Sequence, residues 1–91
     1  MFHLRTTPGY ERDVRSATKN NALLLDVIEM LLDVLEQDPY NKSRQYNIKK
    51  LTDVKAGDGQ WRIRAGKFRL RYDIIGQEVI LYSFRHRKEA Y

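Results

Sequence analysis

Residues 61–72 read WRIRAGKFRLRY, and in this stretch apolar and basic residues alternate on both sides of one glycine. Such alternation has the period of a half-buried strand, in which successive side chains point to opposite faces. The segment Ala65-Gly66-Lys67 is suited to the turn between two strands. We therefore predict a β-hairpin with an apolar and a basic face. The apolar face consists of Trp61, Ile63, Phe68, Leu70 and Tyr72, and the basic one of Arg62, Arg64, Arg69 and Arg71.

The basic side of this hairpin carries four guanidinium groups that repel one another. A surface of this kind is expected to be matched by an anion, and RNA phosphate is the obvious candidate because guanidinium groups fit phosphate geometry. The alternative is a sheet face that only contacts water, which is the usual role of arginines that alternate along an exposed strand.

Length and composition limit the possible classes. A chain of 91 residues supports one small domain, residues 1–91. The absence of cysteine excludes disulfides and a cysteine nucleophile. The two histidines, His3 and His86, lack the carboxylate spacing of a metal site, so we predict neither metal nor cofactor. No apolar run is long enough to cross a membrane and residues 1–10 lack a signal-peptide pattern, so we expect a cytoplasmic protein.

Charge is distributed unevenly along the chain. Residues 1–38 contain four Lys/Arg and seven Asp/Glu, a net charge of −3, whereas residues 39–91 contain thirteen and five, a net charge of +8. A basic excess along a sheet and a tail is typical of nucleic-acid binding. A charged surface that only keeps the protein soluble is the alternative interpretation.

The remaining pattern predicts an α+β domain. Phe2–Thr6 alternates like a strand, and Thr7-Pro8-Gly9 ends it. Helices are predicted at Tyr10–Thr18 and at Asn20–Gln37, the second capped by Asn20 or Asn21. A short piece at Ile48–Leu51 precedes predicted strands at Gln60–Ala65, Lys67–Ile75 and Val79–Phe84. We thus expect an N-terminal strand, two helices and a three-stranded antiparallel meander, with the helices on one sheet face.

The C-terminal tail is also basic and follows directly from the last predicted strand. It contains Arg85, His86, Arg87, Lys88 and Tyr91. Cleavage of RNA through its own 2'-hydroxyl needs a proton acceptor, a proton donor and fixed positive charge at the phosphate. His86 or Tyr91 could move protons, although a tyrosine base needs nearby cations that favour its phenolate. A disordered basic tail without such a role is the alternative.

Hairpin and tail together resemble those of the RelE/ParE superfamily of bacterial toxins, and within it the RelE-like ribosome-dependent mRNA endonucleases. The resemblance covers most of the chain. It rests on Asp38-Pro39 after the long helix, Lys50-Leu51 before a glycine-containing loop, WRIRAGKFR at 61–69, Tyr72, and HRKEAY at 86–91.

The resemblance implies a microbial RNase fold that cleaves mRNA in the ribosomal A site without a metal and leaves a 2',3'-cyclic phosphate. By position it implies that Arg62 and Arg64 hold phosphate and stabilise an anionic base, and that Arg69 contacts the scissile phosphate. The predicted RNA-binding residues beside these are Lys49, Lys50, Lys67, Arg71 and Lys88.

The same resemblance assigns the tail two roles. Arg85 or Arg87 corresponds to a basic residue with an acid or charge-stabilising role, and Tyr91 to a tyrosine proposed as the base. Some details depart from the superfamily pattern. Lys49-Lys50 stands where some relatives carry a glutamate base, and four residues separate His86 from Tyr91 where other relatives have a pair. Arg71 occupies a position that is generally aliphatic.

Other functions and the partners stay open at this point. ParE-like members share the scaffold and inhibit DNA gyrase without the nuclease residues, and a nucleic-acid-binding module without toxicity would bind with strong salt dependence. Under either toxin hypothesis, an acidic antitoxin that covers the basic face is the expected partner. The nuclease hypothesis adds the ribosome and mRNA as partners.

Overall fold

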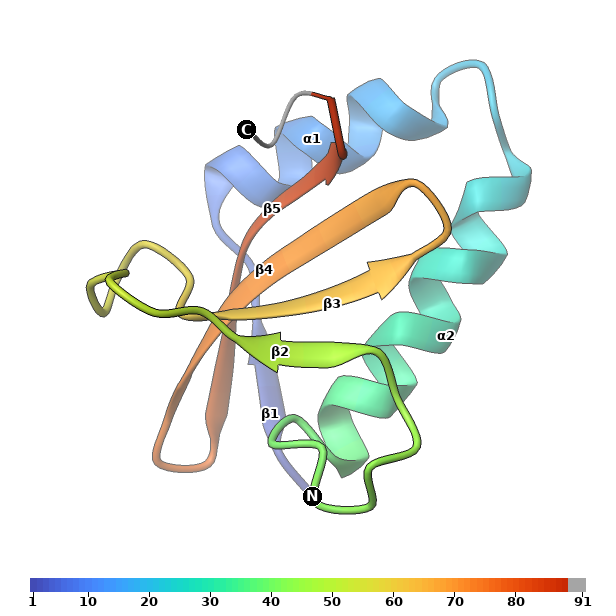
Figure 1. Cartoon of the computed structure of the whole chain (residues 1–91). Coiled ribbons are helices and arrows are strands. Elements are labelled where there is room, and N and C mark those ends of the chain that lie inside the picture. The colour runs from blue at the N-terminus through green and yellow to red at the C-terminus, as the bar shows by residue number, and fades with distance from the viewer. Residues whose placement is uncertain (89–91) are drawn as a thin grey trace.

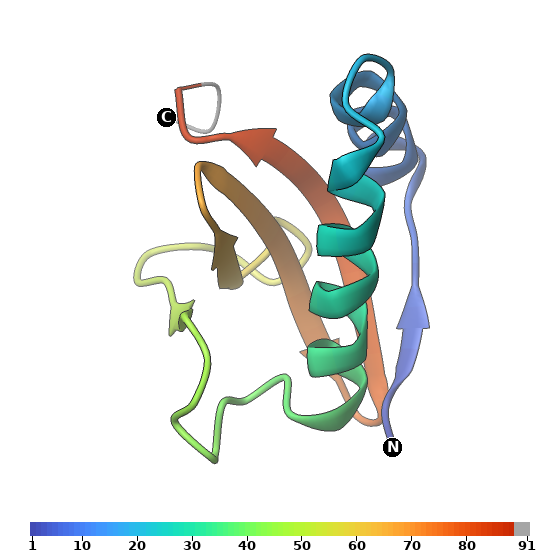
Figure 2. The ribbon, with the colours of Figure 1, turned by 90° about the vertical axis from the view of Figure 1, so that its right-hand side faces the viewer.

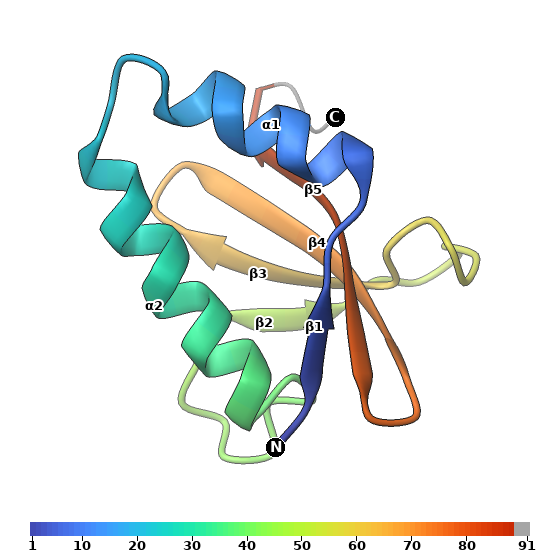
Figure 3. The same cartoon turned by 180° about the vertical axis from the view of Figure 1, so that it is seen from behind.

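A computed structural model of the chain describes residues 1–88. The helices are α1 (Pro8–Thr18) and α2 (Leu23–Gln37), and the strands are β1 (His3–Arg5), β2 (Ile48–Lys50), β3 (Trp61–Ala65), β4 (Phe68–Ile75) and β5 (Glu78–His86). The strands form one sheet in the order β1-β5-β4-β3-β2, as Figure 1 shows. Both helices lie on the same side of this sheet (Figure 2 and Figure 3). The predicted α+β class with helices on one sheet face is confirmed.

The antiparallel part of the sheet has one more strand than we expected from the sequence. The short piece after the polar loop forms β2, which pairs with β3 in antiparallel register. β2, β3, β4 and β5 therefore follow one another as a meander, while β1 pairs in parallel with β5. Since β1 and β2 occupy opposite edges, the two helices carry the chain across the face between them and cover it.

Both helices begin elsewhere than the sequence pattern indicates. Pro8 opens α1 instead of separating it from the strand, because the first turn of a helix does not need the N–H that proline lacks. Thr7 caps this turn by accepting the N–H of Tyr10 at 3.3 Å. Helix α2 starts at Leu23 without a side-chain cap, so neither predicted asparagine cap is made. Within residues 1–88, neither helix is long and apolar enough to span a membrane.

The core lies between the helices and the apolar face of the sheet. The predicted apolar face of the hairpin is confirmed, since its central side chains point toward the helices. The turn between the strands is shorter than predicted and consists of Gly66 and Lys67, with Gly66 at a φ of 57° that favours glycine. The buried apolar residues are Tyr10, Ile28, Leu31, Leu35, Ile63, Leu70, Tyr72, Val79, Leu81 and Phe84.

Replacing Tyr72 with phenylalanine is expected to lower the free energy of unfolding by about 1–2 kcal/mol. The buried hydroxyl donates to the carbonyl of Pro39 at 2.7 Å, just after α2 ends. Its removal leaves that carbonyl without its donor. Urea denaturation measures the difference. Tyr40→Phe is the matched control, because Tyr40 is 41% exposed and its change should cost less than about 0.5 kcal/mol.

The Tyr72 effect is expected to depend on pH in a defined direction. Burial, and then the negative charge of Asp38, raise the pKa of the Tyr72 phenol. The folded protein therefore keeps this proton at pH values where the unfolded chain loses it, near pH 10. The stability that Tyr72 contributes is complete below pH 10 and is lost as the pH rises further. The gap between wild type and Tyr72→Phe should shrink above pH 10, and a constant gap would contradict the burial of a neutral phenol.

Candidate functional site

The sheet face opposite the helices carries basic residues in rows across neighbouring strands. Arg64 on β3 lies beside Arg69 on β4, which lies beside Arg85 on β5. In a second row, Arg62 lies beside Arg71. The prediction that the hairpin arginines share one face is confirmed, and this face is turned toward the viewer in Figure 1. We call this surface the basic face; its residues are Lys49, Arg62, Arg64, Arg69, Arg71 and Arg85.

Arg69 forms the floor of the basic face. It is only 7% exposed, and its Nη1 reaches the carbonyl of Phe68 at 3.5 Å. Its buried Nε has no hydrogen-bond partner, and no carboxylate of the described chain, residues 1–88, lies within ion-pair distance. A buried charge without a counter-charge costs free energy. An anion bound beside Arg69 would offset this cost.

Arg85 is held at the edge of the basic face by α1. Its Nε pairs with Oδ2 of Asp13 at 3.2 Å, and the same oxygen accepts the N–H of Phe84 at 3.1 Å. The Arg85 side chain is still 48% exposed. One carboxylate therefore joins α1 to β5 and fixes one side of a guanidinium whose other side faces solvent.

The outer part of the basic face is bordered by the loop between β2 and β3. The Arg71 guanidinium donates two hydrogen bonds to the backbone carbonyl of Gly59 in this loop. Arg71 is therefore partly engaged by the protein itself, and its predicted contact with RNA stays a prediction. Lys49 is exposed on β2 beside this row.

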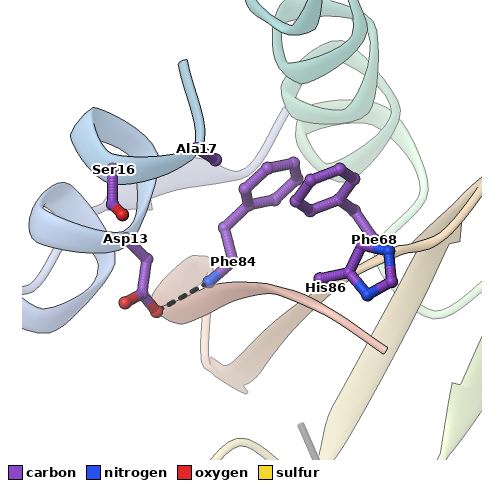
Figure 4. A pocket seen from close by; sticks show the side chains of 6 residues that line it. All are labelled: Asp13, Ser16, Ala17, Phe68, Phe84 and His86. Carbon is purple, nitrogen blue, oxygen red and sulfur yellow. Dashed lines mark hydrogen bonds between the residues drawn. The ribbon is translucent and has the colours of Figure 1, made fainter. Parts of the chain in front are cut away.

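His86 lies on the opposite side of the sheet from the arginines. Its backbone pairs with Phe68, and the two rings meet edge to face with centroids 5.5 Å apart. The imidazole lines a pocket of about 270 Å³ together with Asp13, Ser16, Ala17, Phe68 and Phe84. Figure 4 shows these side chains from close by. The expectation that His86 joins the arginines in one hollow is therefore wrong, because strand alternation sends residues 85 and 86 to opposite faces.

The sequence matches the family described as ParE toxin of type II toxin-antitoxin system, parDE, over residues 4–91. The chain belongs to this toxin family. No curated protein matches the sequence. The fold of this chain resembles that of a chain in the toxin–antitoxin complex RelBE2 from Mycobacterium tuberculosis. The TM-score is 0.70 and the sequences are 24% identical, and the match covers 94% of this chain and 98% of that chain. The RelB–RelE antitoxin–toxin complex from Methanococcus jannaschii gives a TM-score of 0.72, 17% identity, and coverage of 94% and 93%.

These comparisons confirm the predicted RelE/ParE superfamily. At such identities the two solved structures show the fold alone. A fold that the whole superfamily shares does not determine which surface is functional, so the function of this ParE-family toxin depends on its own residues.

The remaining predicted site residues of the toxin fall into separate groups. The N–H of Arg87 donates to the carbonyl of Lys67 at 2.7 Å, which brings the start of the tail to the hairpin turn. Arg87, Lys67 and Lys88 are exposed there. Lys50 is turned to the helix side, with its Nζ 5.7 Å from the centre of the Trp61 ring, so it lies away from the basic face. Tyr91 lies outside the described residues.

Two carboxylates that organise the basic face of this toxin were not expected from the sequence. Asp73 lies on β4 and is 2% exposed. Asp73 continues the alternation of Arg69 and Arg71, so the two-residue period of a strand was enough to predict it on this face. Asp13 is distant in sequence from Arg85, and no local signal indicates their contact.

Proposed function

We propose that this ParE-family toxin is an endoribonuclease that cleaves translated mRNA in the ribosomal A site. The row Arg64, Arg69 and Arg85 carries this proposal, because its central guanidinium is buried and has no carboxylate partner within residues 1–88. A phosphate group would supply the missing negative charge. Guanidinium groups pair strongly with phosphate oxygens, and their fixed charge stabilises the additional negative charge of the transition state.

The proposed reaction uses the RNA as its own nucleophile. The 2'-oxygen attacks the adjacent phosphorus, the bond from phosphorus to the 5'-oxygen breaks, and a 2',3'-cyclic phosphate and a 5'-hydroxyl result. Arg64 and Arg69 would hold the non-bridging oxygens. Arg85 or Arg87 would stabilise charge on the departing 5'-oxygen or protonate it, and Tyr91 would accept the proton of the 2'-hydroxyl. His86, on the helix side of the sheet, has no place in this reaction.

We also propose that an antitoxin covers the basic face. The two similar folds come from structures of toxin–antitoxin complexes, which supports such a partner. The net charge of +8 over residues 39–91 favours an acidic segment that folds on binding. Co-purification with the product of an adjacent small open reading frame tests this partner.

The nuclease proposal is tested by mapping mRNA ends after cell-free translation with the purified toxin. We expect new ends at codons in the ribosomal A site. Tyr91→Phe should reduce them strongly, whereas His86→Ala should change them by less than about threefold because its imidazole points away from the basic face. Circular dichroism establishes that each variant is folded. Intact message in the presence of folded wild-type toxin would contradict the proposal.

Inhibition of DNA gyrase is a second candidate function, which the match to the ParE toxin family favours. In that case the arginines would contact a protein rather than RNA. A DNA supercoiling assay with the purified toxin separates the two functions. Inhibited supercoiling together with intact message would favour the gyrase target.

A further inference from the structure

The loop between β2 and β3 is fastened to β4 by two side chains of opposite charge. Nε and Nη2 of Arg71 donate to the carbonyl of Gly59 at 3.1 and 2.8 Å. The carboxylate of Asp73 accepts the N–H groups of Gly57 at 2.5 Å and of Gln60 at 2.6 Å. Side chains of β4 thus bind both N–H and carbonyl groups of the loop backbone, at the rim of the basic face.

Gly59 lies so close to Arg71 that any other residue at position 59 would force one of the two to move. Gly59 is buried and has a φ of 83°, and a Cβ at this position would lie 3.0 Å from Cβ and 3.4 Å from Nε of Arg71. The loop backbone therefore lies directly against the arginine side chain. The Gly59 carbonyl accepts hydrogen bonds from both Nε and Nη2 of Arg71, so the guanidinium has a fixed orientation. Its third nitrogen, Nη1, makes no bond to the loop.

Asp73 serves the loop rather than a cation. No lysine or arginine of residues 1–88 forms an ion pair with it, although it follows two arginines on the same face. Tyr82 is its further neighbour, because burial and then the adjacent negative charge of Asp73 raise the pKa of the Tyr82 phenol. A buried carboxylate that accepts hydrogen bonds from the backbone of one loop holds that loop in place.

We propose that Gly59 and Asp73 are positioning residues that hold the Arg71 guanidinium as the outer phosphate contact of the basic face. This inference rests on the proposed nuclease function. Arg71 lies in the second row beside Arg62, two residues along β4 from Arg69. Two residues of a strand span about 6.6 Å, so the second row can take a phosphate next to the scissile one on the same RNA strand.

The test measures how salt weakens binding of a short 2'-O-methyl RNA, which cannot be cleaved because its nucleophilic oxygen is blocked. For single strands, the slope of log K against log salt is about 0.7 per phosphate contact. Arg71→Ala is expected to reduce the slope by about 0.7 and to weaken binding about tenfold at low salt. Gly59→Ala should do the same, and adding it to Arg71→Ala should cause no further loss.

Gly57→Ala is the matched control for Gly59→Ala. Gly57 lies in the same loop with a φ of 98°, but a Cβ there meets nothing within 4 Å. This variant keeps the N–H that Asp73 accepts and strains the loop backbone without touching Arg71, so its slope should fall by less than that of Gly59→Ala. Asp73→Asn is a second, independent variant that releases the loop and should behave like Gly59→Ala. Asp58→Asn controls for charge, because Asp58 is an exposed carboxylate of this loop.

The outcomes separate the positioning role from the nuclease function. Unchanged slopes for Gly59→Ala and Asp73→Asn, measured on folded variants, would overturn the positioning role while wild-type binding and cleavage keep the nuclease proposal in place. An equal loss for Gly57→Ala would also overturn it, since loop strain alone would explain the effect. Wild-type toxin that does not bind the RNA would overturn the positioning role, while the mapping of mRNA ends after translation would still decide the nuclease proposal.

Discussion

Replacing Arg69 with methionine is expected to make the toxin more stable and to remove its activity. The buried guanidinium has no carboxylate partner within residues 1–88, and its Nε makes no hydrogen bond there. Exchanging such a charge for an apolar side chain of similar length should raise the free energy of unfolding by about 1–3 kcal/mol. Cleavage of message should fall by about 10²–10³-fold, because the central charge at the scissile phosphate is lost.

Urea denaturation and mapping of mRNA ends measure the two effects of Arg69→Met. Arg12→Met is the control, because it removes an exposed arginine from α1. Its stability should stay within about 0.5 kcal/mol of wild type, and its cleavage should not change. An Arg69→Met protein that is less stable than wild type would show that the guanidinium is well satisfied in the fold. Full cleavage by this variant would remove Arg69 from the site.

The hairpin could be predicted from the sequence because its signal is local. The alternation from Trp61 to Tyr72 depends only on the two-residue period of a strand, and the paired strands then bring Arg62 beside Arg71 and Arg64 beside Arg69. The helices covering the apolar face follow from the same reasoning, since that face has to be buried. In this hairpin, the short segment itself largely determines the register and the two faces.

The position of His86 could not be predicted because β5 contains an irregularity. Val79 and Leu81 face the core, and continued alternation would put Phe84 and His86 on the open face. The register between β4 and β5 shifts near Arg71 and Tyr72, so that Phe84 and His86 face the helices instead. A β-bulge adds one residue to one strand and reverses the alternation beyond it. No residue pattern in residues 78–86 reveals this bulge.

The contacts that fasten the basic face to the rest of the protein are also absent from any local pattern. The hydrogen bonds from Arg71 to Gly59 and from Gln60 to Asp73 connect a loop to a strand across the sheet surface. Such contacts depend on how the whole chain folds. They are also what turns a charged sheet face into a site with fixed geometry, since exposed arginine side chains are otherwise free to move.

Replacing Asp13 with alanine is expected to damage both the fold and the site. The side chain is 14% exposed, and its Oδ2 accepts from the N–H of Phe84 and from Nε of Arg85. Its loss leaves the Phe84 N–H without its acceptor, which should lower the free energy of unfolding by about 2–3 kcal/mol. Cleavage should fall by about tenfold or more, since the Arg85 guanidinium is no longer held beside Arg69.

Asp13→Asn separates these two effects. Its amide oxygen can still accept the N–H of Phe84, but it carries no charge to orient Arg85. We therefore expect urea denaturation to show most of the wild-type stability, while cleavage stays close to that of Asp13→Ala. Glu11→Ala, an exposed carboxylate on the same helix, should change neither quantity. If Asp13→Asn regained cleavage together with stability, Asp13 would act on the fold alone, and the arginine row would not depend on α1 for its geometry.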